Sequence, residues 1–181
     1  MKSCITTYTG ARFDPTRPKA EDIHIEDIAH ALSLICRGNG HVKHFFSVGQ
    51  HSLHCAGEAL ARGHSARVAM ACLLHDASEA YMSDVPRPFK AFLGEYRALE
   101  DRFMGVVYEK YLGTPLTPEE EALVRQIDDH MLWYNLRDLL CDPPEGPAPA
   151  MKSEFSQAFV PFEEVEREYL TLFEKLRAAL R

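Results

Sequence analysis

The sequence predicts an all-α fold, a compact bundle of about six helices. Apolar residues recur at three- and four-residue steps over several long stretches, which is the pattern of amphipathic helices. Strand signals are nearly absent, and prolines and glycines divide the chain into segments of helix length. With 181 residues the chain is long enough to bury a proper core, so residues 1–181 are expected to form a single domain.

The composition excludes several classes of protein. The net charge of −7 argues against a general binder of nucleic-acid polymers, which needs a basic surface. No run of about 18 apolar residues could cross a membrane, and the N-terminus lacks the apolar core of a signal peptide. The five cysteines form no CxxC pair. We therefore expect a cytoplasmic protein, with small, buried, reduced cysteines at Cys36, Cys55 and Cys72.

The first part of the chain leads into a helix. Residues 1–22 are irregular and are interpreted as an N-terminal tether that lies across the domain, with a short edge strand at residues 3–8 as the one candidate there. Residues 25–37 are the first predicted helix, because its apolar residues follow helical spacing and Gly38 marks its end. Arg37 has two interpretations: it caps the last carbonyls, or it contacts an anion at a pocket mouth.

The second predicted helix, residues 47–62, carries two histidines. Ser47 is its expected N-cap and Gly63 ends it. His51 lies on the apolar stripe. His54 lies one turn away, so an HxxH metal pair is conceivable, and the alternative is that His54 belongs to a solvated polar patch.

The third predicted helix, residues 65–81, is apolar until it reaches His75, Asp76 and Glu79. Burying ionisable groups is unfavourable unless they are paired or bind a metal. His75 and Asp76 point about 100° apart on a helix, so both can reach one ion beside it. Glu79 lies one turn on, where it could act on water without being a ligand. The alternative is a hydrogen-bonded core histidine beside a capping aspartate.

A stiff loop over residues 82–90 follows directly. Pro86 and Pro88 exclude a helix interior there. Asp84, Arg87 and Lys90 are its charged residues, and cations beside a metal would suit a phosphate. The alternative is an ordered connector whose charges are merely solvated.

The fourth and fifth predicted helices are long. The fourth begins at residue 88 or 89 and ends at residue 111. The fifth, residues 117–140, begins with Thr117 as N-cap, Pro118 at the first helical position and Glu120 completing a capping box. On this helix Asp128 projects at the edge of the apolar arc.

The neighbouring Asp129 projects beside Arg125 and is assigned to the surface, so Asp128 is the carboxylate expected to point inward. Beyond it, residues 142–160 form a Pro-rich loop, because five of them are proline or glycine within a short span. Residues 161–181 are the last amphipathic helix.

Four potential ligands now stand on three helices. Two imidazoles and two carboxylates would suit one divalent ion, namely Co²⁺, Mn²⁺, Fe²⁺, Mg²⁺ or Zn²⁺. This ligand set differs from that of a thiolate zinc site. The order H…HD…D resembles the HD-domain phosphohydrolase superfamily, and the HDxSE string followed by DxPxPxK is similar to its compact bacterial 5′-deoxynucleotidase branch. Phage deoxynucleoside triphosphate triphosphohydrolases share these elements. The resemblance covers roughly residues 25–140 and rests on four potential ligands: His51, His75, Asp76 and Asp128.

The resemblance implies a role for each of the remaining polar residues. Glu79 would be the acid/base residue that orients the attacking water, and Asp84 would assist the water or the leaving group. Arg37 and Lys90 would contact phosphate. The deoxynucleotidase branch carries an Arg-Trp pair upstream of the first metal histidine, whereas Gly38 follows Arg37 here. Phe45 and Phe46 are the nearby aromatic replacements.

Three functions compete at this stage. The first is a 5′-nucleotidase that releases orthophosphate from deoxynucleoside 5′-monophosphates, which the HDASE string favours. The second is a triphosphohydrolase that releases tripolyphosphate, and the third is a non-catalytic nucleotide- or metal-binding module. A cyclic-dinucleotide phosphodiesterase fits less well. Expected partners are a small (deoxy)nucleotide and a second copy in a homodimer, because the compact relatives associate; no nucleic-acid polymer and no membrane are expected.

Overall fold

A computed structural model describes residues 4–141 and 144–180. Its central element is helix α3 (Ala66–Leu74), in which every residue from Val68 to Leu74 is buried. The Ser65 side chain caps α3 by accepting a hydrogen bond from the Val68 amide. A helix that is apolar on all sides must be covered all round. Four other helices contact α3.

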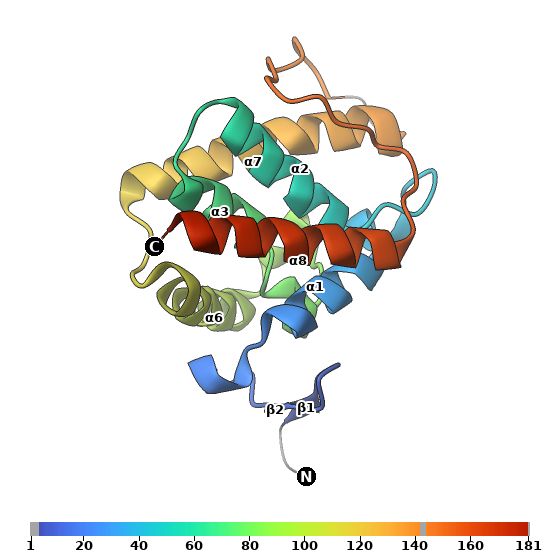
Figure 1. The fold of residues 1–181 in the computed structure, drawn as a ribbon. Coiled ribbons are helices and arrows are strands. Elements are labelled where there is room, and N and C mark those ends of the chain that lie inside the picture. Colours follow the sequence, from blue (N-terminus) through green and yellow to red (C-terminus); the bar gives the residue numbers. More distant parts are fainter. Residues whose placement is uncertain (1–3, 142–143, 181) are drawn as a thin grey trace.

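Three helices pack on one another, and the last two of them also contact α3. They are α1 (Ile25–Leu34), α2 (Val48–Ala61) and α8 (Phe162–Ala179), and α8 crosses the other two (Figure 1). The backbones of α1 and α2 come close at Gly49, where an added Cβ would lie 3.2 Å from the backbone of Leu32 and Ser33. Ser47 is the N-cap of α2, as predicted, and its side chain accepts from the Gln50 amide.

Helix α3 also meets α6 (Gly94–Leu112) and α7 (Pro118–Leu139). The predicted capping box of α7 is confirmed, because Thr117 and Glu120 each accept from the other's backbone amide. Within the described residues, six α-helices are nine residues or longer and the only sheet has two short strands. The all-α class and the expectation of about six helices are therefore confirmed. No helix in the described chain combines the length and apolar character needed to cross a membrane.

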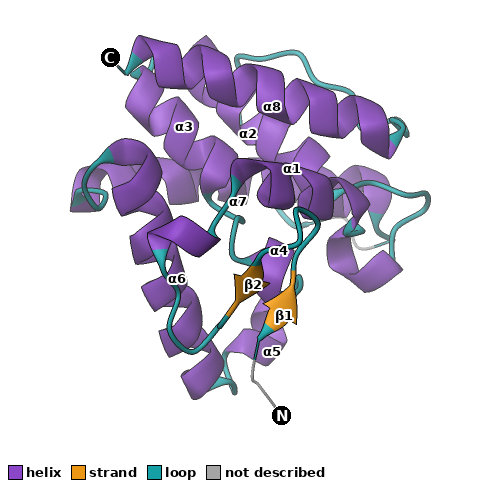
Figure 2. Ribbon diagram, turned by 60° about the horizontal axis from the view of Figure 1, so that its bottom comes forward, coloured by secondary structure: helices purple, strands orange, loops and turns teal. Residues whose placement is uncertain are grey.

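The N-terminal residues 4–22 pack onto the body of the fold. Strands β1 (Ile5–Thr6) and β2 (Arg12–Phe13) form an antiparallel pair, and this hairpin lies on the other side of α1 from α8 (Figure 2). The amide and hydroxyl of Thr9 donate to Asp27 at 2.7 and 3.0 Å. Phe13 is fully buried against Tyr81 and Phe103. A 3₁₀ turn, η1 (Ala20–Asp22), then leads into α1.

The prediction of a first helix over residues 25–37 is wrong at its end. Helix α1 stops at Leu34, because the next residues are extended and pair with residues 46–48. The Arg37 amide donates to the Phe46 carbonyl at 2.9 Å, and the Val48 amide donates to the Ile35 carbonyl at 3.0 Å. Arg37 therefore caps no helix; it opens a 3₁₀ turn, η2 (Arg37–Gly40).

Two other predicted helices are interrupted. The helix expected over residues 65–81 ends at Leu74, turns through residues 75–78 and resumes as α4 (Glu79–Met82). The helix expected from residue 88 or 89 to 111 is divided into α5 (Arg87–Lys90) and α6, with Leu93 in a non-helical conformation between them. Periodicity did not reveal either break, because the residues around a single tight turn keep nearly helical spacing.

The Pro-rich segment has no helix or strand in its described part, residues 144–160, as predicted. It is nevertheless fixed to the bundle. The Glu58 carboxylate on α2 accepts from the amides of Lys152 and Ser153 and from the Ser153 hydroxyl. The Tyr134 hydroxyl on α7 donates to the Pro149 carbonyl at 2.8 Å.

Candidate metal centre

The turn after α3 directs two potential ligands into the same space. The Ala77 amide donates to the Leu74 carbonyl and the Glu79 amide to the Asp76 carbonyl, so these bonds span three residues rather than four. Such bonds wind the chain more tightly than an α-helix does. With this winding, His75 Nε2 and Asp76 Oδ2 lie 3.3 Å apart. The His75 Nδ1 atom lies 2.7 Å from the Cys72 carbonyl oxygen, which holds the ring in place.

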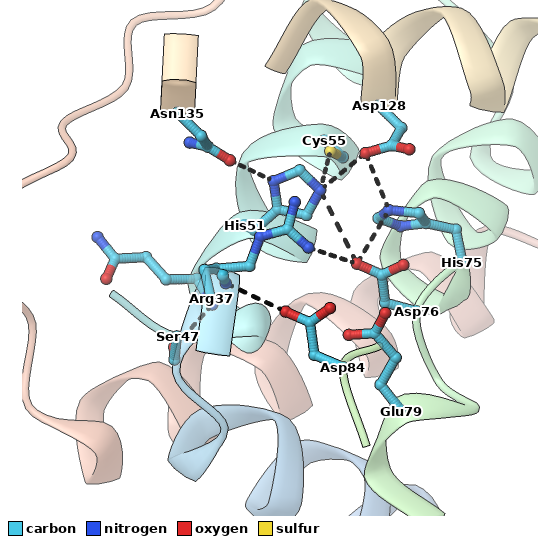
Figure 3. A network of polar contacts seen from close by, with 12 residues as sticks. Arg37, Ser47, His51, Cys55, His75, Asp76, Glu79, Asp84, Asp128 and Asn135 are labelled. Atoms are coloured by element: carbon cyan, nitrogen blue, oxygen red, sulfur yellow. Dashed lines mark hydrogen bonds and ion pairs between the residues drawn. The ribbon is translucent and has the colours of Figure 1, made fainter. Parts of the chain in front are cut away.

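His51 comes from the first turns of α2, and its side chain is fully buried. Because Ser47 fixes where α2 begins, it also fixes the face on which His51 lies. The His51 Nε2 atom points toward the turn after α3 and lies 3.9 Å from Asp76 Oδ2 (Figure 3).

Asp128 stands in the middle of α7 and faces inward, as the helical spacing predicts. Its Oδ1 atom lies 3.1 Å from His51 Nε2 and 3.6 Å from His75 Nε2. The neighbouring Asp129 is exposed and pairs with Arg87 at 2.6 Å. Two imidazole nitrogens and two carboxylates from three separate elements therefore meet at one point (Figure 3).

Cys55 is a member of this cluster that sequence reasoning assigned only to the core. Its Sγ atom lies 3.5 Å from His51 Nε2. His51, Cys55, His75 and Asp128 offer ligand atoms within 4.8 Å of one another, so this group could hold a metal ion. The spacing could have predicted the approach of Cys55 to His51, because Cys55 follows His51 by one helical turn. Burial raises the pKa of Cys55 well above its usual value, which disfavours the thiolate that ligation requires.

Charges within the cluster depend strongly on one another. Burial lowers the pKa of His75, but Asp76 and Asp128 outweigh this effect and raise it to about 9. Burial raises the pKa of Asp128, yet the hydrogen bond with His51 and the nearby positive charge of His75 hold it well below its usual value. Burial and the Arg37 charge lower the pKa of His51. A cation bound between these residues would take the place of the proton that this raised pKa favours on His75.

The donor set fits a divalent cation. His75 Nε2 is buried without a hydrogen-bond partner among the described residues, although Asp76 Oδ2 and Asp128 Oδ1 lie 3.3 and 3.6 Å away. An uncompensated buried nitrogen beside two carboxylates is explained by an ion that all of them would bind. Neutral imidazoles and carboxylates together suit a borderline or hard ion such as Co²⁺, Mn²⁺ or Zn²⁺.

Glu79 and Asp84 border the cluster without joining it. Glu79 is 4% exposed, and its Oε2 atom has no hydrogen-bond partner in the described chain. Burial, reinforced by the charges of Asp76 and Asp84, raises the pKa of Glu79 well above its usual value. Asp84 accepts a hydrogen bond of 3.3 Å from the Gly38 amide, which joins the loop after α4 to η2.

The two predicted phosphate contacts both stand beside carboxylates. Arg37 Nη1 donates to Asp76 Oδ2 at 3.3 Å. Lys90 Nζ donates to Glu100 at 2.7 Å and lies 3.8 Å from Glu79. Arg87 binds Asp128 Oδ2 at 2.5 Å, so one of its nitrogens already contacts a potential metal ligand.

A cavity of about 1140 Å³ opens onto this centre. Its polar wall contains the charged residues Arg37, Glu79, Asp84, Arg87, Lys90 and Asp128. Its apolar residues come from the segment after η2, from α6 and from α7, and include Val42, Met104, Leu132 and Leu136. A lining that combines apolar residues with a group of charged side chains is the composition expected of a small-molecule site.

Three sequence-based candidates lie elsewhere. His54 is not in the cluster; it packs between Phe46 and Phe155, and burial lowers its pKa to about 4. Phe46 is fully buried, and Phe45 packs against Phe159, so neither lines the cavity. The aromatic side chain in the described wall is Tyr108.

Comparison with known proteins places the chain among relatives without stating an activity. No family model matches the sequence. The chain is 39% identical over 140 residues to the uncharacterised protein YfdR of Escherichia coli strain K12, an alignment that covers 77% of this chain and 74% of YfdR. It is also 39% identical over 109 residues to an uncharacterised protein of Rhodobacter capsulatus, covering 57% of this chain and 55% of that protein. The helical fold and the His/Cys/Asp cluster are compatible with an HD-type fold. By its identity to YfdR and the extent of the alignment, the chain belongs to the YfdR family.

Proposed function

We propose that this protein is a metal-dependent phosphohydrolase of the HD-domain type, a 5′-nucleotidase that releases orthophosphate from deoxynucleoside 5′-monophosphates. One observation carries the proposal: His51, His75, Asp76 and Asp128 converge from three elements. The last three line a cavity together with Glu79, Arg37 and Lys90. The sequence resemblance to compact deoxynucleotidases adds the substrate class.

The four converging residues would hold one divalent ion. Such an ion would lower the pKa of a water molecule and polarise a phosphoryl oxygen. The hydrolysis forms a bond from the water oxygen to phosphorus and breaks the bond from phosphorus to the sugar O5′. One proton must leave the water, and one must reach the departing O5′.

Glu79 is the group placed to move that proton. Its buried carboxylate, whose pKa is raised, would accept the proton from water and return it to the leaving oxygen. Asp84, which raises the pKa of Glu79 through its charge, would assist the water or the leaving group. Arg37 and Lys90 would neutralise charge that develops on the phosphoryl oxygens.

A triphosphohydrolase is the second candidate, and one feature of the cavity favours it. Besides the two cations above, Arg87, Arg97 and Arg125 line the same cavity. These side chains could neutralise β- and γ-phosphates, which a monophosphate lacks. The substrate in either case would be a small nucleotide.

Identification of the products separates these functions. The protein is incubated with Co²⁺ or Mn²⁺ and deoxynucleoside mono-, di- and triphosphates. Nucleoside and orthophosphate from monophosphates alone support the 5′-nucleotidase. Release of tripolyphosphate from a triphosphate would instead identify the protein as a triphosphohydrolase. Lack of any product with an ion bound would overturn both and leave a binding module.

A further inference from the structure

The two ring nitrogens of His51 face different surroundings. Nε2 faces the cluster, whereas Nδ1 lies 3.0 Å from Asn135 Oδ1 on α7. A neutral imidazole carries its proton on one nitrogen only. Ligation through Nε2 therefore requires that Nδ1 holds the proton and donates it to a neighbouring acceptor.

His75 and His51 obtain this acceptor in different ways. His75 Nδ1 faces the Cys72 carbonyl, and a backbone carbonyl can only accept. His51 faces the side-chain amide of Asn135, which can present either its oxygen or its NH₂ group. The protonation of His51 thus depends on what holds the Asn135 amide in one orientation.

A chain of hydrogen bonds fixes that orientation. Asn135 Nδ2 donates to Gln157 Oε1 at 2.8 Å, and Gln157 Nε2 donates to Asp138 Oδ2 at 3.1 Å. An aspartate is ionised at neutral pH even without a neighbouring charge, and the hydrogen bonds from the Arg137 guanidinium lower the pKa of Asp138 further. Asp138 therefore only accepts. If both amides were reversed, the Gln157 oxygen would face the Asp138 carboxylate, which is unfavourable.

We propose that Asp138, Gln157 and Asn135 act as a relay of positioning residues that keeps His51 protonated at Nδ1, so that Nε2 is free to ligate the ion. This proposal rests on the metal site of the proposed function. It also assigns a role to the Pro-rich segment, because Gln157 belongs to it and its neighbours are fixed to α2: Gln50 Nε2 donates to the carbonyls of Ser156 and Ala158.

The first test changes only the far end of the relay. Asp138→Asn keeps the shape of the side chain but lets it donate to Gln157, so both amide orientations become paired. Its Co²⁺ dissociation constant, measured by isothermal titration calorimetry, should rise roughly tenfold, at the low end of what losing an outer-shell partner of a ligating histidine costs. Arg137→Gln is the matched control, because it removes the neighbouring charge but leaves Asp138 as an acceptor; its affinity should equal that of the wild type.

The second test separates the relay from simple electrostatics. Asn135→Asp places an acceptor directly beside His51 Nδ1, so the protonation of His51 no longer depends on Gln157. In that background, adding Asp138→Asn should change the Co²⁺ affinity by less than about twofold, which is a non-additive pair of effects. If the charge of Asp138 acted only by attracting the cation, its loss would weaken binding equally in both backgrounds.

Each outcome decides between the two accounts. A loss of affinity that Asp138→Asn causes in the wild-type background, and that disappears in the Asn135→Asp background, supports the relay. An equal loss in both, or none in either, overturns it. If the wild-type protein binds no ion, the relay and the metal site fail together. If it binds Co²⁺ with the predicted pattern but hydrolyses no phosphate ester, the relay stands and only the proposed function fails.

Discussion

His51 Nε2 lies 3.1 Å from Asp128 Oδ1, although 77 residues separate the two in the chain. The contact exists because α2 and α7 both pack on α3 and on each other. An ion bound between them would therefore connect elements that only tertiary packing brings together. Its binding should stabilise the whole bundle, since a ligand that binds only the folded state shifts the unfolding equilibrium.

Asp128→Asn and its neighbour Asp129→Asn form a matched pair on one helix. Asp128→Asn should abolish binding of Co²⁺ and remove the increase in melting temperature that the ion gives the wild type, because a carboxylate ligand is lost. Asp129→Asn should retain both, since that side chain is exposed and binds Arg87. Calorimetric titration and thermal unfolding measure the two effects. Loss of binding in Asp129→Asn instead would show that the wrong carboxylate has been assigned.

Glu79→Gln should separate binding from chemistry. The variant keeps the size of the side chain but cannot accept a proton, so turnover should fall by about 10²- to 10⁴-fold. Co²⁺ affinity should stay close to that of the wild type, because Glu79 is not among the converging ligands. Glu121→Gln, which changes another carboxylate of the cavity wall, is the control and should keep turnover. Undiminished activity of Glu79→Gln would remove Glu79 from the mechanism.

Cys55→Ala tests which fourth ligand the centre uses. Cys55 and Asp76 both lie near His51 Nε2, at 3.5 and 3.9 Å. Because burial raises the pKa of the thiol, we expect Asp76 to be the ligand and Cys55 to stay protonated. The Co²⁺ protein should then lack a thiolate charge-transfer absorption band, and Cys55→Ala should leave the spectrum unchanged. A strong near-ultraviolet band that the substitution removes would make Cys55 a ligand.

Glu58 should contribute to stability in a pH-dependent way. Burial raises its pKa, but the hydrogen bonds from Ser153, Arg62 and Lys152 outweigh this and lower it. A lowered pKa stabilises the fold above the unfolded-state pKa, and that contribution is lost as the pH falls through the folded-state value. Glu58→Ala should destabilise the protein by about 3 kcal/mol at pH 7, since it removes the carboxylate that pairs with the largely buried Arg62.

Urea unfolding at a series of pH values measures this contribution. The difference between wild type and Glu58→Ala should shrink toward acid pH. Glu154→Ala, an exposed glutamate of the same segment, should have no comparable effect at any pH. A difference that is the same at pH 3 and pH 7 would show that the Glu58 charge does not fix the segment.

The sequence predicts those features that depend on local structure. Helix N-caps at Ser47 and Thr117 are visible because each needs only its own first turn. The inward direction of Asp128 follows from helical spacing alone. The end of α3 at Leu74 and the approach of Cys55 to the cluster could not be predicted, because they depend on how three helices pack. The position of Gln157 is the hardest of these features to predict, because it lies in a segment without periodicity.

Reconstitution of the metal-free protein tests the central claim most directly. Orthophosphate release from a deoxynucleoside 5′-monophosphate is measured after chelation and again as Co²⁺ is added stepwise. The four-ligand centre predicts no release by the stripped protein, and release that rises with Co²⁺ until one ion is bound per chain. Full activity after complete removal of metal, or no release once the ion is bound, would contradict the proposal.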